Sequence, residues 1–214
     1  MTALELPDVP RWVEAHGIAA DPTHWRTPLG DGFALGHDAA RLVVVAGDAD
    51  AAAVGALAHA YPQHTFLLAQ PTPIERPLER AILHTLPDPD SLPDLEGAAL
   101  LDEQTALPAS LADELAWARS RGPVFTAIVD GVASAFAYAP WRSASWFDVS
   151  VDTVAGARQL GLGTLVASTM IRYELAQGRA PVWGADEGNA ASLRLAKRLG
   201  FAPVDEIWVA ACAR

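Results

Sequence analysis

A glycine-containing turn between a predicted strand and a predicted helix has the composition of an anion-binding site. It reads Arg158-Gln159-Leu160-Gly161-Leu162-Gly163-Thr164. Before it, residues 146–153 alternate apolar and polar side chains, which predicts a single strand. After it, apolar residues recur every three or four positions as far as Tyr173, which predicts a helix. Glycine lets a backbone approach a ligand closely, and the first N–H groups of a helix carry partial positive charge. The turn therefore indicates a site for a phosphate or pyrophosphate.

A second motif follows about one βα unit later. Residues 189–199 have the pattern of a helix that begins at Asn189, carries Ser192 in its first turn and is closed by Gly200. Phe201 then starts a last strand. Arg-x-x-Gly-x-Gly followed by Asn-x-x-Ser and Gly-Phe resembles the GCN5-related N-acetyltransferase (GNAT) family. The resemblance covers roughly residues 105–214.

The resemblance implies an α+β fold with a mixed sheet, GNAT-like in the C-terminal half, with an additional N-terminal α/β subdomain. We expect the division to fall at residue 95, with residues 96–214 as the acyl-CoA-binding catalytic domain and residues 1–95 of unassigned role. Acetyl-CoA would be the co-substrate, and no metal is implied. Its pantetheine arm would lie against the end of the predicted strand 146–153, and its pyrophosphate would lie on the N–H groups of the glycine turn. The implied cofactor-binding residues are Val151, Asp152, Thr153, Arg158, Gln159, Leu160, Gly161, Leu162, Gly163, Thr164, Asn189 and Ser192.

The reaction implied is direct attack of a primary amine on the acetyl thioester, which needs a base, an oxyanion donor and an acid for the leaving thiolate. Two positions depart from the family pattern: Ala196 stands where many members have a tyrosine, and Gly184 where bacterial protein N-terminal acetyltransferases often have a glutamate. A small-molecule amine is therefore favoured over a protein as acceptor. The candidate catalytic residues are Asp148, Ser192 and Tyr138. We favour Asp148 as base because a strand holds it rigidly, and Asp152, Asp186 and Glu187 remain alternatives.

Two other functions fit parts of the pattern. A non-catalytic acyl-CoA-binding module would keep the groove and lose the acid and base, as the alanine at position 196 suggests. A dinucleotide-binding domain fits less well, because the glycine turn follows antiparallel strands and no acidic ribose ligand is evident.

Composition narrows the partners. The 214 residues are 51% hydrophobic and carry a formal net charge of −11, which favours a folded protein and argues against nucleic acid. No apolar run reaches the ~18 residues that cross a bilayer, and no signal peptide is visible, so we expect a cytoplasmic protein with no membrane partner. All six histidines lie in the first 84 residues at spacings that match no metal site.

The remaining predicted elements outline two halves. In the first, strands at 41–46 and 65–69 flank a helix at 51–61, while residues 80–84 fit either a strand or a helical turn. In the second, a helix at 107–119 precedes a hairpin turning at Asp130-Gly131. The last strand, 203–212, would leave an open sheet edge. We expect either the N-terminal half or a second subunit, as in a homodimer, to cover that edge.

Overall fold

A mixed sheet of eight strands runs through the molecule in the order β1-β2-β3-β4-β12-β5-β11-β9, and a second sheet has the order β10-β8-β7-β6. The computed structural model describes residues 6–212. The strands of the first sheet are β1 (Trp25–Leu29), β2 (Gly32–His37), β3 (Leu42–Ala46), β4 (Thr65–Leu68), β12 (Ala202–Ala210), β5 (Glu79–Thr85), β11 (Ala180–Asp186) and β9 (Trp146–Asp148). Those of the second are β10 (Ser150–Thr153), β8 (Val132–Tyr138), β7 (Val124–Val129) and β6 (Ala98–Leu100).

Within residues 6–212, five α-helices and three short 3₁₀ turns accompany the strands. They are α1 (Val13–Ala19), α2 (Ala51–Ala60), α3 (Ala112–Arg121), α4 (Leu162–Ala176), α5 (Ala190–Arg198), η1 (Pro10–Trp12), η2 (Pro89–Ser91) and η3 (Ala155–Ala157). In the part of the chain that the structure describes, no helix has both the length and the apolar character to span a bilayer. The α+β class with a mixed sheet is confirmed.

The two halves repeat one order of elements. In the first, the hairpin β1–β2 is followed by β3 antiparallel to β2, then by α2, then by β4 parallel to β3. In the second, the hairpin β7–β8 is followed by β10 antiparallel to β8, then by α4, then by β11, which is parallel to β9. The N-terminal half thus has the topology expected of a degenerate copy of the C-terminal half.

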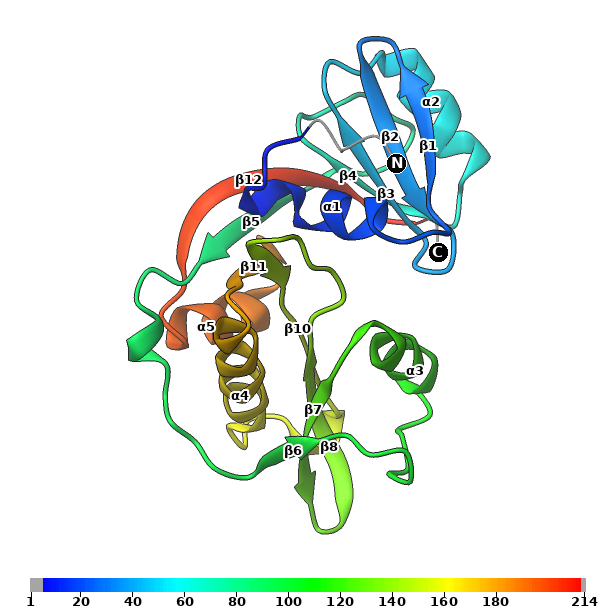
Figure 1. Ribbon diagram of the computed structural model, residues 1–214. Coiled ribbons are helices and arrows are strands. Elements are labelled where there is room, and N and C mark those ends of the chain that lie inside the picture. Colours follow the sequence, from blue (N-terminus) through cyan, green and yellow to red (C-terminus); the bar gives the residue numbers. More distant parts are fainter. Residues whose placement is uncertain (1–5, 213–214) are drawn as a thin grey trace.

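Each half also contributes its last strand to the other. β5, from the first half, pairs with β11, and β12, from the second half, pairs with β4. β5 and β12 pair with each other between them, so β12 crosses from α5 into the N-terminal half (Figure 1). The expectation that the N-terminal half covers the last strand is confirmed. The division into two units at residue 95 stays a prediction. Strands from both sides of that residue alternate in one hydrogen-bonded sheet.

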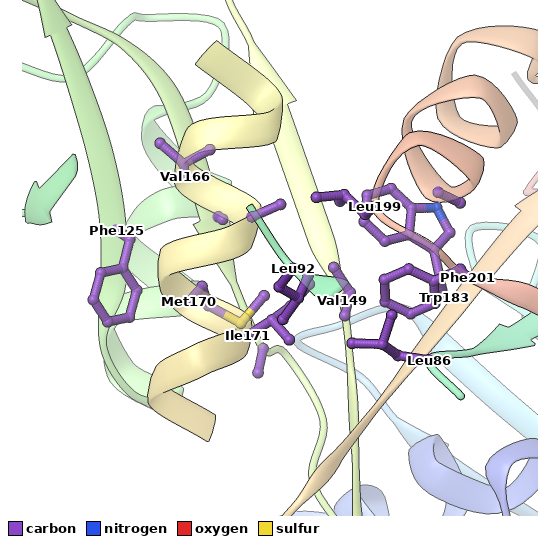
Figure 2. Packing of buried hydrophobic residues seen from close by; sticks show 14 of the residues in the cluster. Leu86, Leu92, Phe125, Val149, Val166, Met170, Ile171, Trp183, Leu199 and Phe201 are labelled. Atoms are coloured by element: carbon purple, nitrogen blue, oxygen red, sulfur yellow. The ribbon is translucent and has the colours of Figure 1, made fainter. Parts of the chain in front are cut away.

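The core of the C-terminal half lies between α4 and the strands. Val166, Met170 and Ile171 of α4 are buried against Val149, Trp183 and other side chains (Figure 2). On the opposite face of β7 and β8, α3 packs with its own smaller cluster around Leu115 and Phe136. Figure 1 shows the strands of this half between α3 and α4.

Two sequence predictions need correction. The helix predicted over residues 107–119 begins only at Ala112, because residues 108–111 form a turn in which the Leu111 N–H donates to the Pro108 carbonyl at 2.9 Å. The single strand predicted over residues 146–153 is interrupted at Val149 and divided between the two sheets. Periodicity was a correct guide to which side chains share a face, but it carries no information on where a strand changes partner. Residues 80–84, left open by the pattern, lie in the strand β5.

Candidate cofactor groove and acceptor cavity

The interruption at Val149 opens a groove between two strands. β9 pairs in parallel with β11 up to Asp148 opposite Val182, and the Val149 N–H donates to the Val182 carbonyl at 3.0 Å. From Ser150 onward the chain turns to pair with β8. Within residues 6–212, no pairing joins β10 to β11. Their facing backbone edges are therefore free for a ligand.

A cavity of about 630 Å³ lies in this groove. Eleven of the twelve predicted cofactor-binding residues line it: Val151, Asp152, Thr153, Arg158, Gln159, Gly161, Leu162, Gly163, Thr164, Asn189 and Ser192. Leu160 is the exception, and its side chain is 61% exposed. The structure thus brings together residues from the strand end, the glycine turn and α5.

The start of α4 offers unpaired backbone donors. The first intrahelical bond of α4 runs from the Leu165 N–H to the Gly161 carbonyl at 3.2 Å, and no side chain caps the helix. Among the described residues, no protein oxygen accepts from the N–H groups of residues 159–164. Free N–H groups at a helix N-terminus attract an anion, which is the chemistry predicted from the turn.

The structure explains why Gly161 and Gly163 of the turn are glycines. Gly161 has φ of +81°, a left-handed conformation that glycine adopts without strain. A Cβ on Gly163 would lie 3.3 Å from Leu195 Cδ2 and 3.7 Å from Thr153 Oγ1. The absence of a side chain at Gly163 therefore keeps the groove open where the helix passes β10 and α5.

Basic side chains of α5 also line the groove. Arg194 and Arg198, one turn apart on α5, join Arg158 in its wall. None of the three forms an ion pair with a described residue. The signal in the sequence that could have found this face of α5 is the spacing of four between the two arginines on the helix that begins at Asn189. In a chain of net charge −11, three free cations here favour an anionic ligand.

The three candidate catalytic residues occupy different places. Ser192 lies in the groove, where its Oγ accepts a hydrogen bond from Trp183 Nε1 at 2.8 Å. Tyr138 lies on the opposite face of the sheet, under α3. Asp148 lies beside α1 and lines neither this groove nor the cavity described next.

The environment of Asp148 suits a base at neutral pH. Burial raises the pKa of Asp148 to about 7, and burial together with the Asp148 charge raises the pKa of Glu14 on α1 to about 8. Because the Asp148 charge disfavours ionisation of Glu14, the two carboxyls do not both ionise readily near neutral pH. Glu14 comes from the N-terminal half, and no sequence motif pointed to it.

A second cavity, of about 560 Å³, lies on the other face of the same strand segment. Ser150 pairs with Tyr138, so both point towards α3, whereas Val151 packs on the α4 side. The second cavity is lined from both halves: by Ala39, Ala40, Arg41, Leu42 and Thr65, and by Asp113, Glu114, Trp117, Tyr138, Pro140, Trp141 and Ser150. The two cavities therefore meet the segment 149–151 from opposite sides.

Two carboxylates, Asp113 and Glu114, and one cation, Arg41, line this second cavity. The Tyr138 hydroxyl is 2.6 Å from Glu114 Oε1 and 3.0 Å from Asp152 Oδ2. Burial and these two charges raise the pKa of Tyr138, so it stays protonated, and burial and Glu114 raise the pKa of Asp152. Trp117 and Trp141 stand 5.4 Å apart beside them. Acidic groups among aromatic rings suit a cation. In residues 6–212, no three His, Cys, Asp or Glu side chains are grouped to hold a metal.

Comparison with known proteins agrees with the fold and with the position of the groove. Residues 119–209 match the family described as GNAT acetyltransferase. The resemblance to the GNAT family predicted from the two motifs is thereby confirmed over these residues, which make up less than half of the chain. No curated protein sequence matches the chain.

Solved structures share the fold over nearly the whole chain. A protein of Novosphingobium aromaticivorans assigned to the GNAT family as an acetyltransferase is 19% identical, with a TM-score of 0.67, covering 97% of this chain and 98% of its own. A GCN5-related N-acetyltransferase from Kribbella flavida is 17% identical, with a TM-score of 0.62 and 95% of each chain covered. A tandem GNAT protein from the clavulanic acid biosynthesis pathway is 15% identical, with a TM-score of 0.52, covering 95% of this chain and 94% of its own. At these identities the likeness establishes the fold, N-terminal half included.

Proposed function

We propose that this protein is an N-acetyltransferase that moves an acetyl group from acetyl-CoA to a primary amine of a small molecule. The observation that carries the proposal is the groove between β10 and β11, which ends at the unpaired N–H groups of residues 159–164. An anionic diphosphate fits that end, and a pantetheine arm can pair with the free strand edges as an added strand would. Arg158, Arg194 and Arg198 supply charge for the phosphates.

The second cavity is the proposed place of the acceptor. Its carboxylates, Glu114 above all, attract an ammonium group, and the segment 149–151 separates it from the groove. An amine entering from this side reaches the thioester through the gap where β10 leaves β11. Asp148, with its pKa near 7, is the proposed acceptor of the proton of the attacking amine, and because it lines neither cavity the proton would reach it through water. The volume of about 560 Å³ suits a small molecule.

The test is a thiol-release assay with acetyl-CoA and a panel of primary amines, preceded by calorimetry with acetyl-CoA and with NAD. We expect acetyl-CoA to bind, NAD not to bind, and at least one amine to give thiol and an acetylated product. Absence of acetyl-CoA binding would overturn the proposal.

One observation favours a second candidate, a non-catalytic acyl-CoA-binding module. Ala196 is fully buried where many family members carry a tyrosine, so no hydroxyl lies at that position. Binding of acetyl-CoA with no thiol release from any amine in the panel would select this candidate.

A further inference from the structure

Trp183 stands at the point where the groove opens. It is the first residue of β11 beyond the last pair with β9, and its side chain is 3% exposed. Its ring packs edge-to-face against Phe201 with the ring centroids 5.3 Å apart. Figure 2 shows the two side chains next to each other. Buried on both sides, the indole has a fixed orientation, and its Nε1–H points at Ser192 Oγ, 2.8 Å away. Both residues line the groove.

This hydrogen bond fixes the direction of the Ser192 proton. An indole N–H only donates, so the Ser192 oxygen accepts and its own O–H remains to be donated elsewhere. A helical hydroxyl usually returns its proton to the carbonyl four residues earlier, as Thr169 does to Leu165 at 3.0 Å. Among the described residues, the Ser192 hydroxyl has no such acceptor. Its proton is therefore free to be donated to a ligand in the groove.

The direction in which the pantetheine arm would lie places its thioester near Trp183 and Ser192. A diphosphate on residues 159–164 occupies one end of the groove, and Val149 and Trp183 form the other end, where the strands meet. Apolar side chains surround that end, so negative charge forming there would be poorly solvated without a donor.

We infer that Trp183 is a positioning residue that turns the Ser192 hydroxyl towards the sulfur of the bound thioester. In the reaction, the amine nitrogen forms the C–N bond, the C–S bond breaks, and its electron pair stays on sulfur, where the Ser192 hydrogen bond stabilises it. The proton of the amine leaves to the base, and the thiolate takes a proton from solvent. The inference rests on the proposed function and adds a role for a residue that no motif marked.

The test compares three variants. Trp183→Phe keeps an aromatic ring against Phe201 and removes the donor, Ser192→Ala removes the hydroxyl, and Ser192→Thr retains one. Trp208→Phe, in β12, is the matched control, because that indole lines neither cavity. Circular dichroism checks that each variant is folded.

We expect kcat with acetyl-CoA to fall about 100-fold in Ser192→Ala and about tenfold in Trp183→Phe, with the KM for acetyl-CoA within about twofold of the parent. Ser192→Thr should recover most of the loss, and Trp208→Phe should match the parent. A binding readout accompanies these rates: the pKa of the thiol of bound CoA, followed by the ultraviolet absorbance of the thiolate. It should lie below that of free CoA in the parent and rise by about one unit in Trp183→Phe and in Ser192→Ala.

The inference is overturned if Trp183→Phe leaves both kcat and the bound thiol pKa unchanged, or if only the KM rises. If Trp183→Phe does not fold, the Ser192→Ala and Ser192→Thr pair decides by the same two readouts. These failures leave the proposed function standing when the parent is active. A parent protein that does not bind CoA would instead overturn the proposed function itself.

Discussion

The two halves of this chain share a topology but differ at the place where one of them can hold a ligand. In the C-terminal half, β10 parts from β11, and α4 begins at an uncapped glycine turn. In the N-terminal half, β3 and β4 stay paired along their length, from Leu42 opposite Thr65 to Val45 opposite Leu68. The helix α2 there is capped by Asp50, whose carboxylate accepts from the Ala53 N–H at 2.8 Å.

This difference shows what a cofactor site needs beyond the order of elements. A closed pair of strands leaves no edge for an arm to join, and a carboxylate at the helix start already occupies the anion site. The strands differ as well: β3 buries valines on both faces, whereas residues 148–152 present carboxylates on one face. The N-terminal half instead contributes residues that line the second cavity, and it places Glu14 beside Asp148.

The largest effect on kcat is expected from substitution of Asp148, a carboxyl that has no counterpart in β3 of the N-terminal half. Asp148→Asn should lower kcat by about 10²–10⁴ because a neutral amide cannot take the proton of the amine. Since the base works only when ionised, the rate of the parent should rise with pH through about 7, and that limb should vanish in the variant. Steady-state kinetics from pH 5.5 to 9 measures both. Asp48→Asn, after β3, is the control, and Asp148 is not the base if its variant stays within a few-fold of the parent.

The C-terminal ends of the corresponding helices α4 and α2 offer the next comparison. Glu174, 1% exposed at the end of α4, accepts from Arg142 Nη2 at 2.7 Å and from Arg179 Nε at 2.8 Å. The end of α2 is held by Arg76, which donates to the Tyr61 carbonyl at 2.9 Å. Glu174→Gln leaves the partly buried Arg142 and Arg179 without their carboxylate and should lower the free energy of unfolding by about 3–5 kcal/mol.

Arg76→Gln loses hydrogen bonds to carbonyls and should cost about 1.5–3 kcal/mol. Urea unfolding measures both values. Equal losses in the two variants would show that the ion cluster adds nothing beyond a helix-end hydrogen bond.

A side chain that fills the groove should weaken acetyl-CoA binding, whereas the same side chain in the N-terminal half should not. Gly163→Leu places a side chain against Leu195 and Thr153 and should weaken acetyl-CoA binding about 100-fold. Ala52→Leu adds the same side chain at an exposed position near the start of α2 and should leave the affinity unchanged. Calorimetry on both variants decides, and unaltered affinity in Gly163→Leu would place the ligand elsewhere.

The smallest effect concerns the cap that closes the N-terminal helix. Asp50→Ala removes the acceptor for the Ala53 N–H and should cost about 1 kcal/mol of stability, without changing acetyl-CoA affinity. Thermal unfolding with and without acetyl-CoA measures this. A loss of affinity in this variant would mean that the two helix starts do not act independently.

The sequence predicted the chemistry of the groove better than its shape. The glycine turn and Asn189 were recognisable because backbone conformation and helix ends impose residue types at fixed spacings. The split at Val149 was not, since an alternating pattern looks the same whether a strand keeps or changes its partner. Glu14, Trp183 and the exchange of β5 and β12 depend on contacts between distant segments, which no local pattern encodes.

The most direct measurement is amide hydrogen exchange with and without CoA. If the unpaired N–H groups at the start of α4 hold the diphosphate, residues 159–164 and the free edge of β10 should be protected on binding, while residues 42–53 of the N-terminal half stay unchanged. Unaltered exchange at residues 159–164 in the presence of saturating CoA would contradict the account.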